Sequence, residues 1–114
     1  MSGPVEDFAV EITDDGRGVM IRVVGDLDMA TAELLGAELE RAVDSFAGDV
    51  TVNLAAVTFL DSTGLIVLLR GYAALGALGR RLVVAAPARA VKHILELTGL
   101  QDTFQLAPQP RGPA

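Results

Sequence analysis

The sequence predicts one α/β domain: a mostly parallel sheet of four to five strands, with an N-terminal hairpin strand and about three helices. The chain has 114 residues, of which 51% are apolar and 21% charged, so it can bury the core of one ordinary domain. Segments with alternating apolar residues are followed by segments with apolar residues at helical spacing, which is typical of βα units. Polar residues interrupt three of the expected strands, so we expect the helices mainly on one face of the sheet.

The first two strands are expected to form a hairpin. Apolar residues occupy every second position over 8–13 and again over 19–23, the period of a strand with one solvated face. The segment 14–18 between them contains two aspartates and two glycines, the composition of a turn.

A helix is expected after Asp28, because aspartate caps helices by accepting a backbone N–H bond in the first turn. Its apolar stripe recurs at helical spacing and contains Leu35, Leu39, Val43 and Phe46. Gly48 and Asp49 are expected to end this helix. A third strand is then predicted over 50–54, and a loop over 55–61 leads into the next helix.

The second helix is expected over 64–79. This stretch carries a single charge, Arg70, but it is shorter than the roughly 20 apolar residues that span a bilayer, so we interpret it as a buried helix. A fourth strand is predicted over 82–86. The third helix follows Pro87, which suits a first helical turn, and ends at Gly99, a glycine at the position of a C-terminal cap.

The end of the chain carries the weakest pattern. Residues 104–106 are predicted to form a last short strand, and the proline-rich segment after them is too polar to pack. We therefore expect a domain over 8–106 between two flexible segments, 1–7 and 107–114.

Composition excludes several classes of function. The absence of cysteine excludes a disulfide framework, a thiolate metal site and a cysteine nucleophile, and it favours a cytoplasmic protein. The formal net charge is −6 and the nine basic residues are scattered, so we expect no nucleic-acid partner. The segment 1–7 is short and acidic and contains a proline, so we expect no targeting segment and no membrane association.

Two polar segments stand out, each just before an expected helix. Asp26 and Asp28 belong to the first, and Asp61, Ser62 and Thr63 to the second. Both segments follow parallel strands, so we expect them at the same edge of the sheet, where such folds place their sites.

These residues have two interpretations. One is that Asp28, and Thr63 or Ser62 in the second segment, only cap their helices. A cap accounts for one side chain, however, and the second segment has three polar residues in succession. The other interpretation is that Ser62 is exposed at a helix N-terminus and accepts a phosphate there.

Six segments resemble the STAS family in order and spacing: Gly25-Asp-Leu-Asp28, Asn53-Leu54, Phe59-Leu-Asp-Ser-Thr-Gly-Leu65, Arg81-Leu-Val-Val84, Ala90-Val-Lys92 and Leu97-Thr-Gly-Leu100. The resemblance covers about residues 6–106. It is strongest to the stand-alone anti-sigma factor antagonists, also called anti-anti-sigma factors. It implies a domain with helices on one side, in agreement with the alternation of strands and helices.

The resemblance also implies a function. Members of this type are binding proteins rather than enzymes. In their unphosphorylated form they bind an anti-sigma factor that is a serine kinase, and the sigma factor that it holds is released. The kinase phosphorylates the serine after the motif's aspartate, which switches this binding off, and a serine phosphatase reverses the modification. That serine is Ser62 here, with Thr63 as a secondary candidate. The alternative is a STAS-type scaffold or transport accessory subunit that binds partners without phosphorylation. Neither function needs a cofactor, and we expect a monomer or weak dimer.

Other candidate chemistry is weak. His93 is the only histidine, and it has no neighbouring acid or nucleophile that catalysis would need. Lys92 is the only lysine, and together with Asp26, Asp28 and Asp61 it could suggest a phosphate-receiver domain. A phosphate-receiver domain would carry its acidic pair after the first strand, before a helix, whereas the acidic pair that follows the first strand here runs into a turn. Asp26 and Asp28 alone supply too few oxygens for a metal site, so no metal is expected.

The helix after Ser62 carries two stripes. One is expected to cover the sheet and contains Leu65, Leu68, Leu69, Tyr72 and Leu75. The other contains Ile66, Arg70, Ala73 and Ala77, with Val67 beside it, and either a neighbouring helix or a partner covers it. The residues expected to bind a partner are Asp26, Asp28, Asp61, Ser62, Thr63, Gly64, Ile66 and Arg70.

Overall fold

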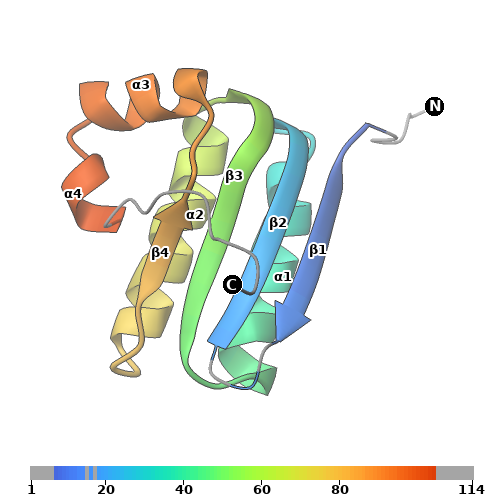
Figure 1. The fold of residues 1–114 in the computed structure, drawn as a ribbon, viewed down its shortest axis with the longest axis vertical. Helices are drawn as coiled ribbons and strands as arrows, with labels where there is room; N and C mark the ends of the chain where they lie inside the picture. Colours follow the sequence, from blue (N-terminus) through green and yellow to red (C-terminus); the bar gives the residue numbers. More distant parts are fainter. Residues whose placement is uncertain (1–6, 15, 17, 105–114) are drawn as a thin grey trace, which may run out of the picture.

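The computed structural model describes residues 7–14, 16 and 18–104. Within them, four strands form one sheet and four helices follow or separate the strands (Figure 1). In chain order the elements are β1 (Ala9–Asp14), β2 (Gly18–Leu27), α1 (Ala32–Ser45), β3 (Asp49–Leu60), α2 (Ser62–Gly76), β4 (Leu82–Ala85), α3 (Arg89–Leu97) and α4 (Gln101–Phe104).

The sheet has the order β1-β2-β3-β4. β1 pairs with β2 in an antiparallel hairpin, from Ala9 opposite Val24 to Asp14 opposite Val19. β2 pairs with β3, and β3 with β4, in parallel. The predicted hairpin and the mostly parallel sheet are therefore confirmed.

The helices lie mainly on one face, as predicted. In Figure 1, α1 and α2 lie behind the sheet, while α3 and α4 lie beyond β4. The core forms between the sheet and these helices, and its strand residues are almost fully buried: Val19, Ile21 and Val23 of β2, and Val50, Val52 and Leu54 of β3. The opposite face carries polar side chains such as Glu11 and Arg22, which form an exposed ion pair.

The C-terminal ends of α3 and α1 are stabilised in different ways, one by adjacent residues and the other by a residue distant in sequence. The C-cap of α3 is Thr98, and the predicted Gly99 follows it with a φ of +73°, where the backbone N–H of Leu100 donates to the Leu95 carbonyl and closes the helix. At the end of α1 the cap is distant in sequence. The Arg80 guanidinium donates to the carbonyls of Ala42, Val43 and Gly48 at 2.6–3.1 Å.

The predicted loop over 55–61 is wrong, because β3 continues to Leu60. Two register shifts between β2 and β3 place three residues of β3 opposite two of β2, first after Asn53 and again at Thr58. These bulges interrupt the regular alternation, and for that reason the second half of the strand has no period of two in the sequence.

Three smaller expectations are also wrong. Phe104 ends a short helix, α4, rather than starting a strand; residues 105 and 106 lie outside the described part of the chain, as do 1–6 and 107–114. Tyr72 does not cover the sheet but is exposed, with its ring edge-on to Phe104. Val67 is buried between α1 and α2 instead of lying beside the exposed stripe. Among the described helices, none has the length and apolar character needed to cross a membrane.

Candidate functional site

The candidate site lies where β2 and β3 end, at the top of Figure 1. Leu27, the last residue of β2, pairs with Leu60, the last residue of β3, so the two strands end side by side. Asp28 and Asp61 follow directly, one on each strand. The prediction that both polar segments lie at one edge of the sheet is therefore confirmed.

Asp61 caps α2. One oxygen of its carboxylate accepts the backbone N–H groups of Thr63 and Gly64, at 2.9 and 3.2 Å, two of the groups that the first turn of a helix leaves without a partner. The backbone N–H of Asp61 donates to the Leu27 carbonyl at 3.2 Å, which ties the start of α2 to the end of β2.

Ser62 is the first residue of α2 and is exposed. Its hydroxyl makes no hydrogen bond with any described residue, because the capping role belongs to Asp61. Thr63 is half-buried. Of the two candidate hydroxyls, Ser62 is thus the more accessible to another protein.

Gly64 allows the first turn of α2 to approach the strand ends closely. A Cβ atom at this position would lie 2.6 Å from Cδ1 of Leu60, 2.8 Å from Cγ of Leu27 and 3.0 Å from the Leu27 carbonyl oxygen. Any larger residue would therefore push the start of α2, and Ser62 with it, away from the sheet.

The loop before α1 is organised by Thr31 rather than by Asp28. The Thr31 hydroxyl, in a residue only 4% exposed, donates to the Asp26 carbonyl at 2.6 Å and accepts the Asp28 backbone N–H at 2.9 Å. The Asp28 carboxylate accepts the Ala30 N–H, so it closes a turn and does not cap α1, whose N-cap residue is Thr31. The prediction that Asp28 caps the helix is therefore off by one turn.

Asp26 belongs to β2 and is held from the neighbouring strand. Its Oδ1 accepts the Thr58 hydroxyl at 2.6 Å, across the second bulge of β3. Every hydrogen bond to the carboxylates of Asp26, Asp28 and Asp61 goes to Oδ1, and no described residue donates to their Oδ2 atoms. The edge therefore presents three carboxylates that can still accept hydrogen bonds from a partner.

Exposed apolar side chains lie in the segments that adjoin Ser62. Met29 in the β2–α1 loop is 78% exposed, Phe59 near the end of β3 is 50% exposed, and Ile66, one turn after Ser62, is 48% exposed. We call these three residues the apolar rim. Arg70, one turn beyond Ile66, is also exposed, as are Ala73 and Ala77, so no neighbouring helix covers this stripe of α2 within the described residues.

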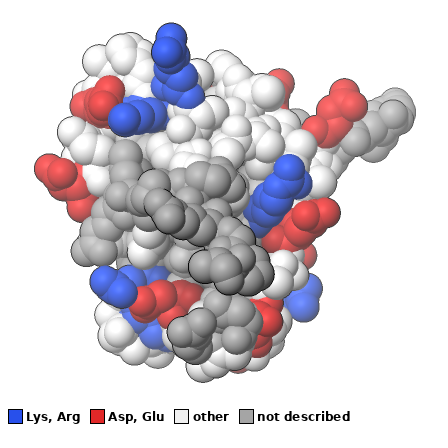
Figure 2. Space-filling view, in the orientation of Figure 1, with Lys and Arg blue, Asp and Glu red and all other residues white. Residues whose placement is uncertain are grey.

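The other candidate reactive side chains of the sequence lie on α3. His93 and Lys92 are exposed on α3, and within the described residues no basic group is hydrogen-bonded to Ser62. No cluster of three or more potential metal ligands occurs among the same residues. On the face shown in Figure 2, Lys and Arg side chains occur at separate places, with acidic residues near several of them. The edge is suited to binding another protein.

The profile of a protein family described as "Mlab, STAS domain" matches residues 10–108, nearly the whole chain. This chain is a STAS domain. It is 29% identical over 97 residues to the anti-sigma-B factor antagonist of Staphylococcus aureus (strain NCTC 8325 / PS 47), covering 85% of this chain and 90% of that protein. It is 32% identical over 86 residues to the anti-sigma-B factor antagonist of Staphylococcus epidermidis, covering 75% of this chain and 80% of that protein.

Solved structures agree with this assignment. An anti-sigma factor antagonist from Mycobacterium paratuberculosis superimposes with a TM-score of 0.83 at 30% identity, covering 95% of this STAS domain and 92% of that chain. The anti-sigma factor antagonist SpoIIAA in its unphosphorylated form superimposes with a TM-score of 0.77 at 23% identity, covering 90% of each chain, a likeness of fold. The family resemblance seen in the sequence is thereby confirmed.

Proposed function

We propose that this STAS domain is an anti-sigma factor antagonist whose binding is switched off by phosphorylation of Ser62. The observation that carries the proposal is the free, exposed Ser62 hydroxyl at the first residue of α2, with Asp61 beside it as the cap. The names of the relatives and of the 30% identical structure support the same function. The site of action would be the cytoplasm, where transcription takes place.

The surroundings of Ser62 explain how one phosphate would act. The apolar rim buries readily against a partner while the hydroxyl is neutral. A phosphate adds roughly 1.5 to 2 negative charges, and removing such a group from water without a paired cation costs several kcal/mol. It would also stand close to the Asp61 carboxylate, which already occupies the N–H groups of the first helical turn.

The chain would supply the acceptor and not the catalyst. Nothing hydrogen-bonded to Ser62 among the described residues would remove its proton, and the glycines of the sequence form no loop that cradles phosphates. We therefore assign the kinase activity to the bound anti-sigma factor and the reversal to a separate serine phosphatase. Asp26, Asp28, Asp61, Thr63, Gly64, Ile66 and Arg70 would shape the binding surface around Ser62.

Affinity capture with four forms of the protein tests this proposal. Wild type and Ser62→Ala should retain an anti-sigma factor with a serine-kinase domain, and Ser62→Asp should lose it. Ser45→Asp is the matched control, because Ser45 is an exposed serine at the far end of α1. It should behave as wild type. Retention of the partner by Ser62→Asp, or phosphate incorporation into Ser62→Ala at the wild-type level, would refute the switch.

The second candidate function is a scaffold or transport accessory subunit that binds without phosphorylation. The description of the matching family is "Mlab, STAS domain". It mentions no sigma factor and is therefore compatible with this candidate. It is distinguished by the same experiment, because a partner that ignores the charge at position 62 should be retained equally by Ser62→Ala and Ser62→Asp.

A further inference from the structure

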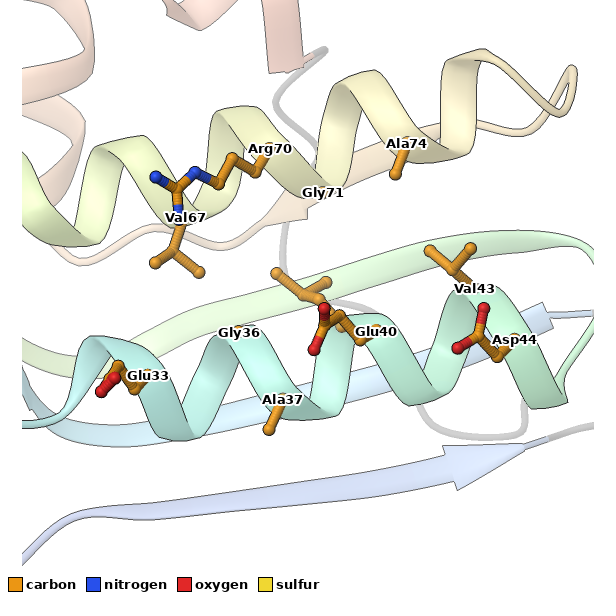
Figure 3. A pocket seen from close by; sticks show the side chains of 11 residues that line it. Glu33, Gly36, Ala37, Glu40, Val43, Asp44, Val67, Arg70, Gly71 and Ala74 are labelled. Carbon is orange, nitrogen blue, oxygen red and sulfur yellow. The ribbon is translucent and has the colours of Figure 1, made fainter.

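A groove of about 520 Å³ runs between α1 and α2, from Glu33 in the first turn of α1 to Asp44 in its last turn. Its floor is apolar and shallow: Val67 and Ala74 of α2 point toward α1, Val43 of α1 points toward α2, and Gly36 and Gly71 have no side chain (Figure 3). Its α1 wall carries three carboxylates, Glu33, Glu40 and Asp44, and its α2 wall carries one cation, Arg70.

Gly36 is not explained by packing within the chain. A Cβ atom at Gly36 would meet only Cγ1 of Val67, at an ordinary contact distance of 3.7 Å, although a glycine inside a helix lowers its stability. Gly71 differs, because a Cβ there would lie 3.0 Å from Leu39 and 3.2 Å from Leu82, so the core requires that glycine. The missing side chain at Gly36 therefore keeps the groove open without improving the fold.

Two of the three carboxylates, Glu40 and Asp44, are likewise unfavourable for the isolated chain, whereas Glu33 lies in the first turn of α1, where negative charge is favourable. All three are exposed, and none forms an ion pair with a described residue. Glu40 and Asp44 are four residues apart, where like charges repel along a helix. Asp44 also lies in the last turn of α1, where the helix dipole disfavours negative charge. A positively charged occupant would remove each of these costs.

We propose that this groove binds a helix of a protein partner that carries a stripe of Lys or Arg beside small or apolar residues. The carboxylates stand at positions i, i+7 and i+11 of α1, a row about 16 Å long that matches cations spaced along three turns of a second helix. The glycine-lined floor lets the two backbones approach closely. This proposal does not rest on phosphorylation of Ser62, which lies outside the groove.

The test is a selection of 18-residue helical peptides from a display library on the immobilised full chain, at physiological salt. Enriched peptides should carry Lys or Arg at helical spacing. Gly36→Met should weaken their binding on the order of tenfold, the loss expected when a central contact is blocked. Gly76→Met is the matched control, because Gly76 is a helical glycine outside the groove with open space around it, and it should leave the affinity unchanged.

Two further variants separate charge and folding from steric effects. Glu40→Lys should weaken binding and reduce its salt dependence, whereas Glu96→Lys on α3 should not. Gly36→Ala should raise the melting temperature of the free protein while weakening peptide binding, an outcome that a misfolded variant cannot produce.

Enrichment of acidic peptides, an absence of enrichment, or equal binding to Gly36→Met would overturn the proposal. So would dimerisation of the protein alone that Gly36→Met abolishes, since the occupant would then be a second copy. Unchanged binding of the peptides to Ser62→Asp would keep this result separate from the switch.

Discussion

At the scale of single residues, the strand-end edge is built by side chains that bind backbone groups. The cap of the second helix was expected at Thr63 or Ser62, but it is the Asp61 carboxylate, because α2 begins at Ser62 and not at Gly64. The role of Thr31 before α1 could not be predicted, because its hydroxyl is hydrogen-bonded to backbone groups of Asp26 and Asp28, up to five residues earlier. Nothing in the local sequence pattern indicates these bonds. The exposure of Met29 and Phe59 likewise depends on how the loop and the bulge turn their side chains.

Gly64 is the residue at this edge where the addition of a single methyl group should destabilise the fold most. Gly64→Ala should lower the free energy of unfolding by about 1–3 kcal/mol, because the new methyl group overlaps Leu27 and Leu60. Urea denaturation measures the loss. Gly76→Ala in the same helix meets no neighbour and should be neutral or raise stability by up to about 1 kcal/mol. Equal effects of the two substitutions would contradict the close approach at Gly64.

At the scale of elements, strands and helices were predictable where the apolar period was regular. α2 and α3 each carry an apolar stripe, and β1 and the first half of β2 alternate cleanly. The second half of β3 was not predictable, because each bulge shifts the side chains to the other face and removes the period of two. α4 was missed because four residues are too few to show a helical stripe.

The stability of the last turn of α1 should depend on Arg80, which lies more than thirty residues later in the sequence. α1 has no basic residue in its own last turn, and the Arg80 guanidinium satisfies carbonyls there. Arg80→Lys keeps the charge but cannot reach three carbonyls at once, so we expect a loss of about 1–3 kcal/mol. Thermal unfolding measures it. Arg41→Lys, an exposed α1 position paired only with Glu38, should change stability by less than about 0.5 kcal/mol.

Asp49 and Arg81 link the starts of β3 and β4 and should add a pH-dependent contribution. Hydrogen bonds from the Arg81 side chain and then from its backbone N–H lower the pKa of Asp49. A lowered folded-state pKa means that the stabilisation is fully present above the unfolded value of about 3.9 and is lost as the pH falls through the folded value. For this exposed pair we expect at most about 1 kcal/mol.

Comparison of wild type with Asp49→Asn by urea unfolding at pH 7, 5 and 3 measures this contribution. Wild type should be the more stable protein at pH 7 and 5, and the difference should shrink at pH 3 as Asp49 becomes protonated. A difference that stays constant down to pH 3 would show that the carboxylate charge has no part in the link.

At the scale of the whole molecule, the family resemblance and the alternation of strands and helices predicted the same architecture, a mostly parallel sheet with helices mainly on one face, and the structure has it. That architecture leaves the outer stripe of α2 open, so Ile66 can be tested as a docking residue. Ile66→Asp should keep a melting temperature near that of wild type and lose the captured anti-sigma factor. Unfolding of the variant would place Ile66 in the core, and unchanged capture would place the docking surface elsewhere.

The attachment of α2 to the end of β2 has a consequence for how the protein would transmit a signal. The backbone N–H of Asp61 is hydrogen-bonded to the Leu27 carbonyl, and Gly64 packs against the ends of both strands. We therefore expect that modification of Ser62 does not tilt α2. Phosphorylation would then change only the surface charge around Ser62, and only a protein in direct contact with this surface would respond. Removal of the phosphate would restore the original state completely. Hydrogen exchange checks this: amides of β4 and α3 should exchange at the same rates in wild type and Ser62→Asp, whereas altered rates there would reveal a transmitted change of shape. The time needed to respond would be set by the two opposing enzymes and by dissociation of the partner, with no refolding step in between.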